Sequence, residues 1–336
     1  MAETITLNEL KPGDIVLFSI PEHSWISSII GFLTHSEVSH TAMVDFNPAY
    51  ILEEGGEGAA QSPLPDPGTR TLYIRRLNNS PDTTKVDDIA MKYVKEKLPY
   101  PMSNLVFLGL YIIAGDFIPD TIAGDIINNI LRLATYELMK LVNNKAHPGT
   151  DVPPMVCSQF AAACYDEAAL TYGPEYKIHY NEKVTTVTTL LRKIIDQLTE
   201  EESKNYSIEM PEHKSLLAEI EGDAAEFHCA KLKKHIESNA FTGNAEKVSD
   251  EMIAVIYNFG RWFLRLFDGK TEYEADAKYA TTEDIKKVLE ELLRFQEAFV
   301  TPGDLLTNTT NLDDMGILTY TAEELQQYKA MKDSAQ

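Results

Sequence analysis

Residues 152–166 read VPPMVCSQFAAACYD, and the rest of the chain is organised around this stretch. Pro153 and Pro154 favour an extended backbone, whereas the residues after Cys157 are rich in helix formers. We therefore expect a helix to begin close to Cys157. The unpaired N–H groups and the helix dipole at such an N-terminus favour the thiolate over the thiol, and the thiolate is the nucleophile. Cys157 is thus the candidate nucleophile.

A lone cysteine is more often a buried packing residue than a reactive one. Cys164 and Cys229 fit that interpretation, since each lies inside a helical pattern among Ala, Phe and Leu. Cys157 differs from them because of its place at a predicted helix start and because a suitable base occurs upstream.

The candidate base is His40, one of eight histidines. It opens a predicted strand, His40 to Phe46, whose alternation puts His40, Ala42 and Val44 on one face and would hold the ring rigidly. The plainer alternative is a strand-end histidine bonded to local backbone. The competing histidines fall in predicted turns and loops or after the nucleophile helix: His23, His35, His147 and His179.

A base of this kind needs a third group to orient it. The returning strand of the same hairpin, YILEE at 50–54, offers Glu53 and Glu54, and cross-strand neighbours lie about 5 Å apart. Alternation groups Glu53 with Ile51, so we choose Glu53 and keep Glu54 as the alternative third residue. Both glutamates could instead simply solvate the edge of the EEGGEGAA stretch, which we expect to be flexible. The predicted oxyanion donor is the backbone N–H of Cys157, with a second donor unassigned.

The surrounding pattern predicts an α+β fold. Strands at Ile15 to Phe18, 40–46, 50–54 and 71–77 indicate a small antiparallel sheet, and a short helix lies between the first two. Helices follow from Val86 to a Pro-Tyr-Pro stop at 99–101 and within the apolar segment 105–142. For that segment core packing is the default, and a lipid-facing or substrate-facing wall is the alternative. Residues 184–299 read as amphipathic helices, one of them starting at Pro211, and 300–318 as irregular.

Composition narrows the classes of function. With 336 residues and 44% hydrophobic content the chain can bury a substantial core. We find no apolar run long enough to span a bilayer and no signal-peptide pattern, so we expect a protein that is cytoplasmic as synthesised. Three cysteines without regular spacing argue against a disulfide framework. The net charge of −22 disfavours nucleic acid as a partner. No metal-ligand spacing or nucleotide-binding glycine fingerprint is present, so we predict neither a metal nor another cofactor.

Several of these motifs occur together in a recognisable order: GDIVLF at 13–18, THSEVSH ending at His40 and followed by AMV, LEE at 52–54, YIRRL at 73–77, and VCSQF at 156–160. The order resembles that of the circularly permuted papain-like enzymes. More narrowly it is similar to the YiiX-like members, relatives of the NlpC-type cell-wall endopeptidases and of lecithin retinol acyltransferase. By position the resemblance makes His40 the base, Glu53 the third polar residue and Cys157 the nucleophile.

The resemblance covers roughly residues 7–175 and 300–318, where TPGDL at 301–305 looks like a closing segment. It implies a permuted papain-like catalytic domain over 1–175 to which 298–320 returns, and an α-helical insertion at 176–297. The residues at 321–336 themselves predict a polar tail, with a helix that frays as the alternative. The apolar segment at 101–150 and the insertion are departures from simpler members.

The resemblance implies a thiol hydrolase of the amidase or cysteine-peptidase type, acting on a small amide or peptide that could derive from the cell wall. A cell-wall substrate would require export without a signal peptide, as for an effector. Two alternatives stay open. One is a lipid acyl hydrolase or acyltransferase with the same triad, in peripheral lipid contact through 105–142. The other is a non-catalytic module whose acidic helices bind a basic partner. The oligomeric state is not predicted.

Overall fold

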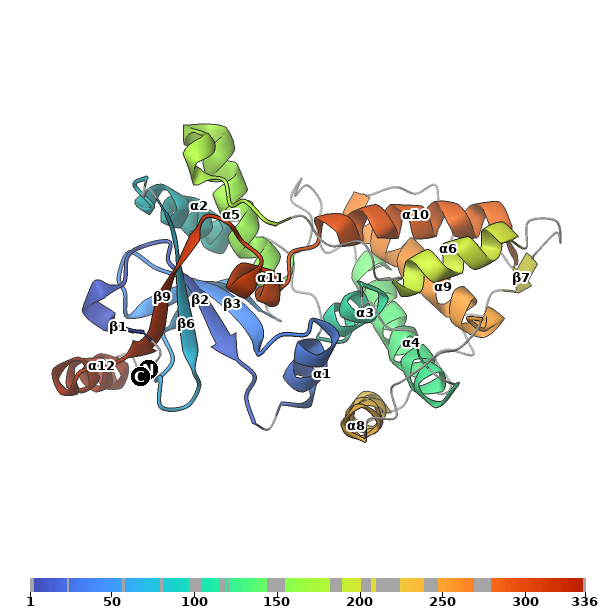
Figure 1. Cartoon of the computed structure of the whole chain (residues 1–336), viewed down its shortest axis with the longest axis horizontal. Helices are drawn as coiled ribbons and strands as arrows, with labels where there is room; N and C mark the ends of the chain where they lie inside the picture. Colours follow the sequence, from blue (N-terminus) through green and yellow to red (C-terminus); the bar gives the residue numbers. More distant parts are fainter. Residues whose placement is uncertain are drawn as a thin grey trace.

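The chain has an α+β fold (Figure 1). The computed structural model describes residues 3–22, 24–55, 58–78, 81–96, 104–114, 119, 121–143, 155–181, 189–200, 207–209, 224–238, 247–268 and 279–334. Some sequence-based expectations therefore lie outside the described residues: the extended Pro153–Pro154 pair, His23 and His147, the stop at 99–101 and the helix expected from Pro211.

Seven strands of the described chain form one mixed sheet in the order β1-β9-β6-β2-β3-β4-β5. Their bounds are β1 (Thr4–Thr6), β2 (Ile15–Ser19), β3 (Val38–Val44), β4 (Tyr50–Gly55), β5 (Gly58–Pro63), β6 (Leu72–Leu77) and β9 (Leu312–Thr319). β1 runs parallel to β9, and the other neighbours are antiparallel. Two further short strands, β7 (Ser207–Glu209) and β8 (Tyr279–Thr281), pair separately.

The sheet is larger than the small antiparallel sheet expected from sequence. Residues 58–60, expected to be part of a flexible stretch, lie in β5, which pairs with β4 along its length. The segment expected to be irregular at 300–318 contains α11 (Pro302–Thr307) and then β9. β9 is inserted between β1 and β6, so the end of the chain returns to the sheet formed by its beginning.

Alternation along the strands divides the sheet into two buried faces. Ile15 and Leu17 of β2 pack on the face covered by α5 (Cys157–Tyr172) and α2 (Thr84–Glu96). Val16 and Phe18 point to the other face, toward β1 and β9 side chains. The helix that carries Cys157 is therefore fixed against the sheet by its apolar side.

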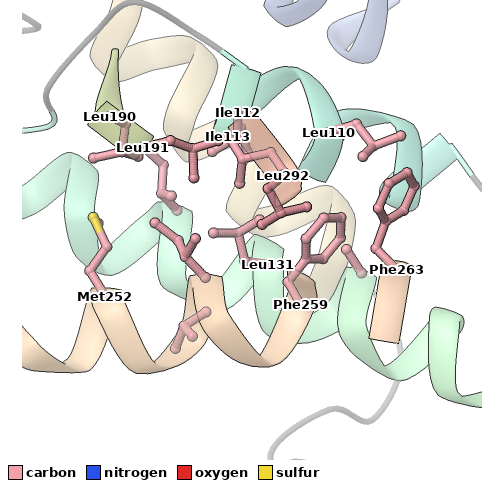
Figure 2. Packing of buried hydrophobic residues seen from close by; sticks show 14 of the residues in the cluster. Leu110, Ile112, Ile113, Leu131, Leu190, Leu191, Met252, Phe259, Phe263 and Leu292 are labelled. Atoms are coloured by element: carbon pink, nitrogen blue, oxygen red, sulfur yellow. The ribbon is translucent and has the colours of Figure 1, made fainter. Parts of the chain in front are cut away.

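A third hydrophobic cluster is built almost entirely from helices. They are α1 (Trp25–Leu33), α3 (Asn104–Ala114), α4 (Thr121–Asn143), α6 (Leu190–Glu200), α8 (Ala224–Glu237), α9 (Asp250–Asp268) and α10 (Thr282–Ala298). Figure 2 shows Leu110, Leu131 and Phe259 converging from α3, α4 and α9. The described residues of the apolar segment 105–142 thus pack largely into this helical cluster, as the core-packing interpretation predicted.

The helical cluster, on the right of Figure 1, combines α3 and α4 from before the nucleophile with α6, α8, α9 and α10 from after it. The helices of this cluster approach one another closely at two glycines. A Cβ on Gly109 would lie 2.7 Å from a ring carbon of Phe259, and one on Gly260 would lie 2.5 Å from Leu292. Among the described helices, none is long and apolar enough to cross a membrane.

The predicted polar tail forms α12 (Ala322–Ser334), which follows β9. Glu324 is buried and accepts a hydrogen bond from the backbone N–H of Asn8 at 2.9 Å. The ring of Tyr328, also buried, lies 5.3 Å from that of Tyr320. This helix is attached to the sheet through these contacts.

Candidate active site

The candidate site lies where β3 and β4 separate. The register of the two strands ends at the pair Ala42 and Glu53, after which β4 continues with β5 alone. The backbone N–H of Thr41, one residue before the last pair, donates a hydrogen bond to the Cys157 side chain. The sulfur of the nucleophile candidate is therefore placed at the point where the sheet opens.

Cys157 is the first residue of α5, as the sequence predicted. Its side chain is partly buried and also accepts a hydrogen bond from the N–H of Ser158. The N–H groups of this first turn have no acceptor within the helix. They are free to stabilise negative charge on the sulfur or on an oxygen bound beside it, which is the role predicted for the backbone of Cys157.

The structure brings His40 to both of its predicted partners. Its Nε2 lies 2.7 Å from Oε2 of Glu53, and its ring is hydrogen-bonded to Cys157. Because Nε2 faces the carboxylate, Nδ1 is the ring nitrogen left for the sulfur. The side chains of His40 and Glu53 are 26% and 23% exposed, so the pair can be reached from solvent.

The charges of these three groups support one another. Burial alone lowers the pKa of His40, but the Cys157 thiolate and the bond to Glu53 raise it to about 10. Burial opposes the thiolate of Cys157, yet the charge and hydrogen bond of His40 bring its pKa below the ordinary value. The pKa of Glu53 is likewise lowered against the effect of burial, first by its bond to His40. All three shifts favour a thiolate–imidazolium pair held by a carboxylate over the neutral forms of Cys157 and His40.

Supports for His40 come from residues that the sequence did not single out. The register of β2 and β3 shifts between Phe18 and Ser19, which leaves Ser39 as the extra residue of a β-bulge directly before His40. Bulges of this kind re-aim the neighbouring side chain. The ring of Phe18 packs against the imidazole with centroids 5.1 Å apart. No hydrophobic period or spacing in the sequence indicates this bulge.

Arg70 adds a positive charge beside the site. Its Nη2 donates to the hydroxyl of Ser39 at 3.0 Å, its Nε donates to the backbone oxygen of Ser19, and its guanidinium lies over the Phe18 ring. Burial lowers the pKa of Arg70 to about 10, while the charge of the Cys157 thiolate works in the opposite direction. An isolated arginine before a strand gives no sequence signal, so this residue was missed.

Glu54, the alternative third residue, points away from His40. It lies on the opposite side of β4 from Glu53, it is 1% exposed, and within the described chain neither carboxylate oxygen has a hydrogen-bond partner. Burial, with the charge of Cys157 second, raises the pKa of Glu54 to about 9. The two adjacent glutamates therefore have opposite protonation states near neutral pH.

The helical cluster also reaches the nucleophile. Tyr111 of α3 is buried, its ring packs edge-on to Phe299 with centroids 5.4 Å apart, and its hydroxyl is hydrogen-bonded to Ser158. The Ser158 hydroxyl in turn donates to the backbone oxygen of Val300 at 2.7 Å. Burial and the charge of Cys157 raise the pKa of Tyr111 well above its ordinary value, so the phenol stays neutral.

The remaining thiols and described histidines lie elsewhere. Burial raises the pKa of Cys164 well above its ordinary value and that of Cys229 to about 12, which fits their assignment to packing. His35 occupies the turn after α1 with a positive φ of 48°. His179 is exposed, and its backbone N–H donates to Asn311 at 2.8 Å.

A cleft of about 360 Å³ lies between the turn after α1 and α11. It is lined by Thr34, His35, Ser36, Glu37, Thr301, Gly303, Asp304, Leu306 and Thr307, and not by the side chains of the Cys157 site. Among the described residues, no group of three or more His, Cys, Asp or Glu side chains is placed to hold a metal ion.

Comparison with models of known protein families gives no match to this chain, and no curated protein sequence matches it.

Proposed function

We propose that the chain is a cysteine-dependent hydrolase that forms a thioester intermediate. The observation that carries the proposal is the convergence of His40 on Glu53 at 2.7 Å and on Cys157 at the first residue of α5. More particularly, the order of His40, Glu53 and Cys157 along the chain supports a permuted papain-like enzyme similar to the YiiX-like group. An amide or short peptide is the substrate that this resemblance implies.

In the proposed mechanism the thiolate of Cys157 attacks the acyl carbonyl carbon. The C=O electron pair moves to the oxygen, and the N–H groups at the start of α5 stabilise the resulting oxyanion. When the tetrahedral intermediate collapses, the C–N bond breaks and imidazolium His40 donates its proton to the leaving amine. Neutral His40 then accepts a proton from water as the water attacks the thioester, and the Cys157 thiolate leaves.

Selective alkylation tests the nucleophile directly. Iodoacetamide at neutral pH, followed by peptide mass spectrometry, should modify Cys157 far faster than Cys164 or Cys229, because only Cys157 has a lowered pKa. Replacement of His40 by Ala is the matched comparison and should slow the modification. Equal modification of all three thiols, or an ordinary thiol pKa near 8.5 at Cys157, would contradict an enzyme and favour a binding module.

Turnover tests the reaction class. Wild type should release amine from a panel of N-acyl amides and short peptides, and Cys157→Ala should release none. Retained turnover in the alanine variant would reject the proposed thioester.

A further inference from the structure

Glu54 has no role in the mechanism above, although β4 packs against α5, the helix that carries Cys157, and the charge of Cys157 acts on Glu54. It follows Glu53, the last β4 residue paired with β3, and so sits at the point where these strands separate. On the partner strand β3, Thr41 lies one residue beyond the same pair, next to Ala42. The Thr41 hydroxyl is buried and, among the described residues, also lacks a hydrogen-bond partner, while the Thr41 N–H reaches Cys157.

The ionised form of a carboxyl group is unfavourable in such a buried position. An ionised carboxyl without a partner in a buried site is strongly disfavoured, and in practice the group keeps its proton. A negative Glu54 would also act through low-dielectric surroundings on the Cys157 thiolate. Two negative charges close together in such surroundings disfavour each other strongly.

The charged groups around Glu54 come from several elements. α5 contributes Cys157, the group that interacts electrostatically with Glu54. β3 contributes His40, and β4 itself contributes Glu53 on its other side. Arg70, from the segment before β6, interacts with Cys157 and Glu53. β5 carries no titratable residue.

The remaining neighbour of β4 is α2, which also carries carboxylates. The Asp87 carboxyl of this helix is hydrogen-bonded to Asp45 and not to Glu54. The negative charge that opposes ionisation of Glu54 is thus that of the Cys157 thiolate.

We propose that Glu54 is a positioning residue that must carry a proton for Cys157 to hold the negative charge of a working nucleophile. The neutral carboxyl does not repel the negative charge on the sulfur, or the oxyanion that forms after the thiolate attacks. The ionised carboxyl opposes both, so Glu54 sets the upper pH limit of the site. This inference rests on the proposed role of Cys157.

The charge near the sulfur can be measured without a substrate by comparing two alkylating agents. Iodoacetamide is neutral and iodoacetate is negative, so the ratio of their rates at Cys157 reports the local charge. In wild type the iodoacetate-to-iodoacetamide ratio should fall as Glu54 ionises near pH 9, and again as His40 loses its proton near pH 10. In Glu54→Gln, which is neutral at every pH, the first fall should be absent and the second should remain.

Asp87→Asn is the matched control. Asp87 is also a buried carboxyl with a raised pKa, about 7, but it lies beside Asp45. This variant should keep the fall near pH 9. A fall near pH 9 of equal size in wild type and Glu54→Gln would overturn the inference. Failure of Cys157 to react at neutral pH in wild type would instead reject the proposed function.

Infrared spectroscopy provides a second measurement that does not need a folded Glu54 variant. Infrared spectra of wild type and Cys157→Ala are compared over a range of pH. The absorption of the protonated Glu54 carboxyl should disappear at a lower pH in the alanine variant, because the thiolate charge no longer opposes ionisation. An unchanged pH for its loss would show that Glu54 and Cys157 are not coupled.

Discussion

Nε2 of His40 lies 2.7 Å from Oε2 of Glu53, and the last register pair of β3 with β4 joins Glu53 to Ala42. The two residues are thus diagonal neighbours across adjacent strands, on the same side of the hairpin. This arrangement leaves one ring nitrogen for the carboxylate and the other for Cys157. The strength of the thiolate–imidazolium pair should therefore depend on Glu53.

Glu53→Gln should weaken that pair without emptying the space that Glu53 fills. A hydrogen bond to a charged group contributes about 1.5–3 kcal/mol, which corresponds to about 1–2 pKa units. We expect the pH of half-maximal iodoacetamide reactivity at Cys157 to rise by about that amount. Glu167→Gln is the control, because Glu167 lies on the same helix but accepts its hydrogen bond from Tyr93. A midpoint that moves equally in both variants would contradict the assigned role of Glu53.

Glu54→Gln should change how stability depends on pH. Folding raises the pKa of Glu54 from 4.5 to about 9, so over this range the folded chain holds a proton that the unfolded chain has lost. The contribution of Glu54 to stability is therefore complete below pH 4.5 and declines as the pH rises toward 9.

Because Gln does not titrate, the free energy of unfolding of Glu54→Gln relative to wild type should be larger at pH 8 than at pH 5. The change should approach about 4 kcal/mol. Urea unfolding at the two pH values measures it, and a pH-independent difference would show that Glu54 is ionised in the folded protein.

Arg76→Met should be among the most destabilising single changes on the sheet. Arg76 donates to both carboxylate oxygens of Asp14, at 2.7 and 2.6 Å, and Asp14 is 2% exposed. Removal of the cation leaves a buried carboxylate without its ion-pair partner, at a cost of about 3–5 kcal/mol. Arg132→Met, which breaks a contact with the largely exposed Glu251, should cost about 0–1 kcal/mol. Similar losses for the two variants in urea unfolding would contradict this difference.

The sequence predicted the elements whose own residues determine them. β2 has a continuous apolar run, and α5 begins at Cys157 as its composition indicated. β5 was missed because GAAQSP carries neither apolar alternation nor β-branched residues, and it is a strand because it pairs with β4. β9 was missed because Asp313 and Asp314 interrupt its apolar alternation. In the structure Asp314 forms an ion pair with Arg75 of β6.

The order of the motifs and the alternation along the strands predicted which residues form the candidate triad. They did not predict the residues that hold the triad in place. Strand alternation chose Glu53 over Glu54, and in the structure Glu53 is the residue that contacts His40. The bulge at Ser39 and the approach of Arg70 depend on contacts between strands that are distant in sequence. Such contacts leave no period or motif by which one sequence could reveal them.

The connection from the helical cluster to the nucleophile gives the last prediction. Tyr111→Phe keeps the ring against Phe299 but removes the hydroxyl that is bonded to Ser158, whose N–H stabilises the Cys157 sulfur. Loss of one buried hydrogen bond costs about 1 kcal/mol, and the first turn of α5 should become less firmly held. We expect a slower reaction of Cys157 with iodoacetamide at neutral pH and a higher midpoint.

The control variant is Tyr93→Phe. The Tyr93 hydroxyl donates a hydrogen bond of 2.5 Å to Glu167, which lies farther along α5, and this variant removes it. It should cost similar stability and leave the reactivity of Cys157 unchanged. If both variants lower stability and neither alters that reactivity, Tyr111 joins the helical cluster to the sheet domain without positioning the nucleophile.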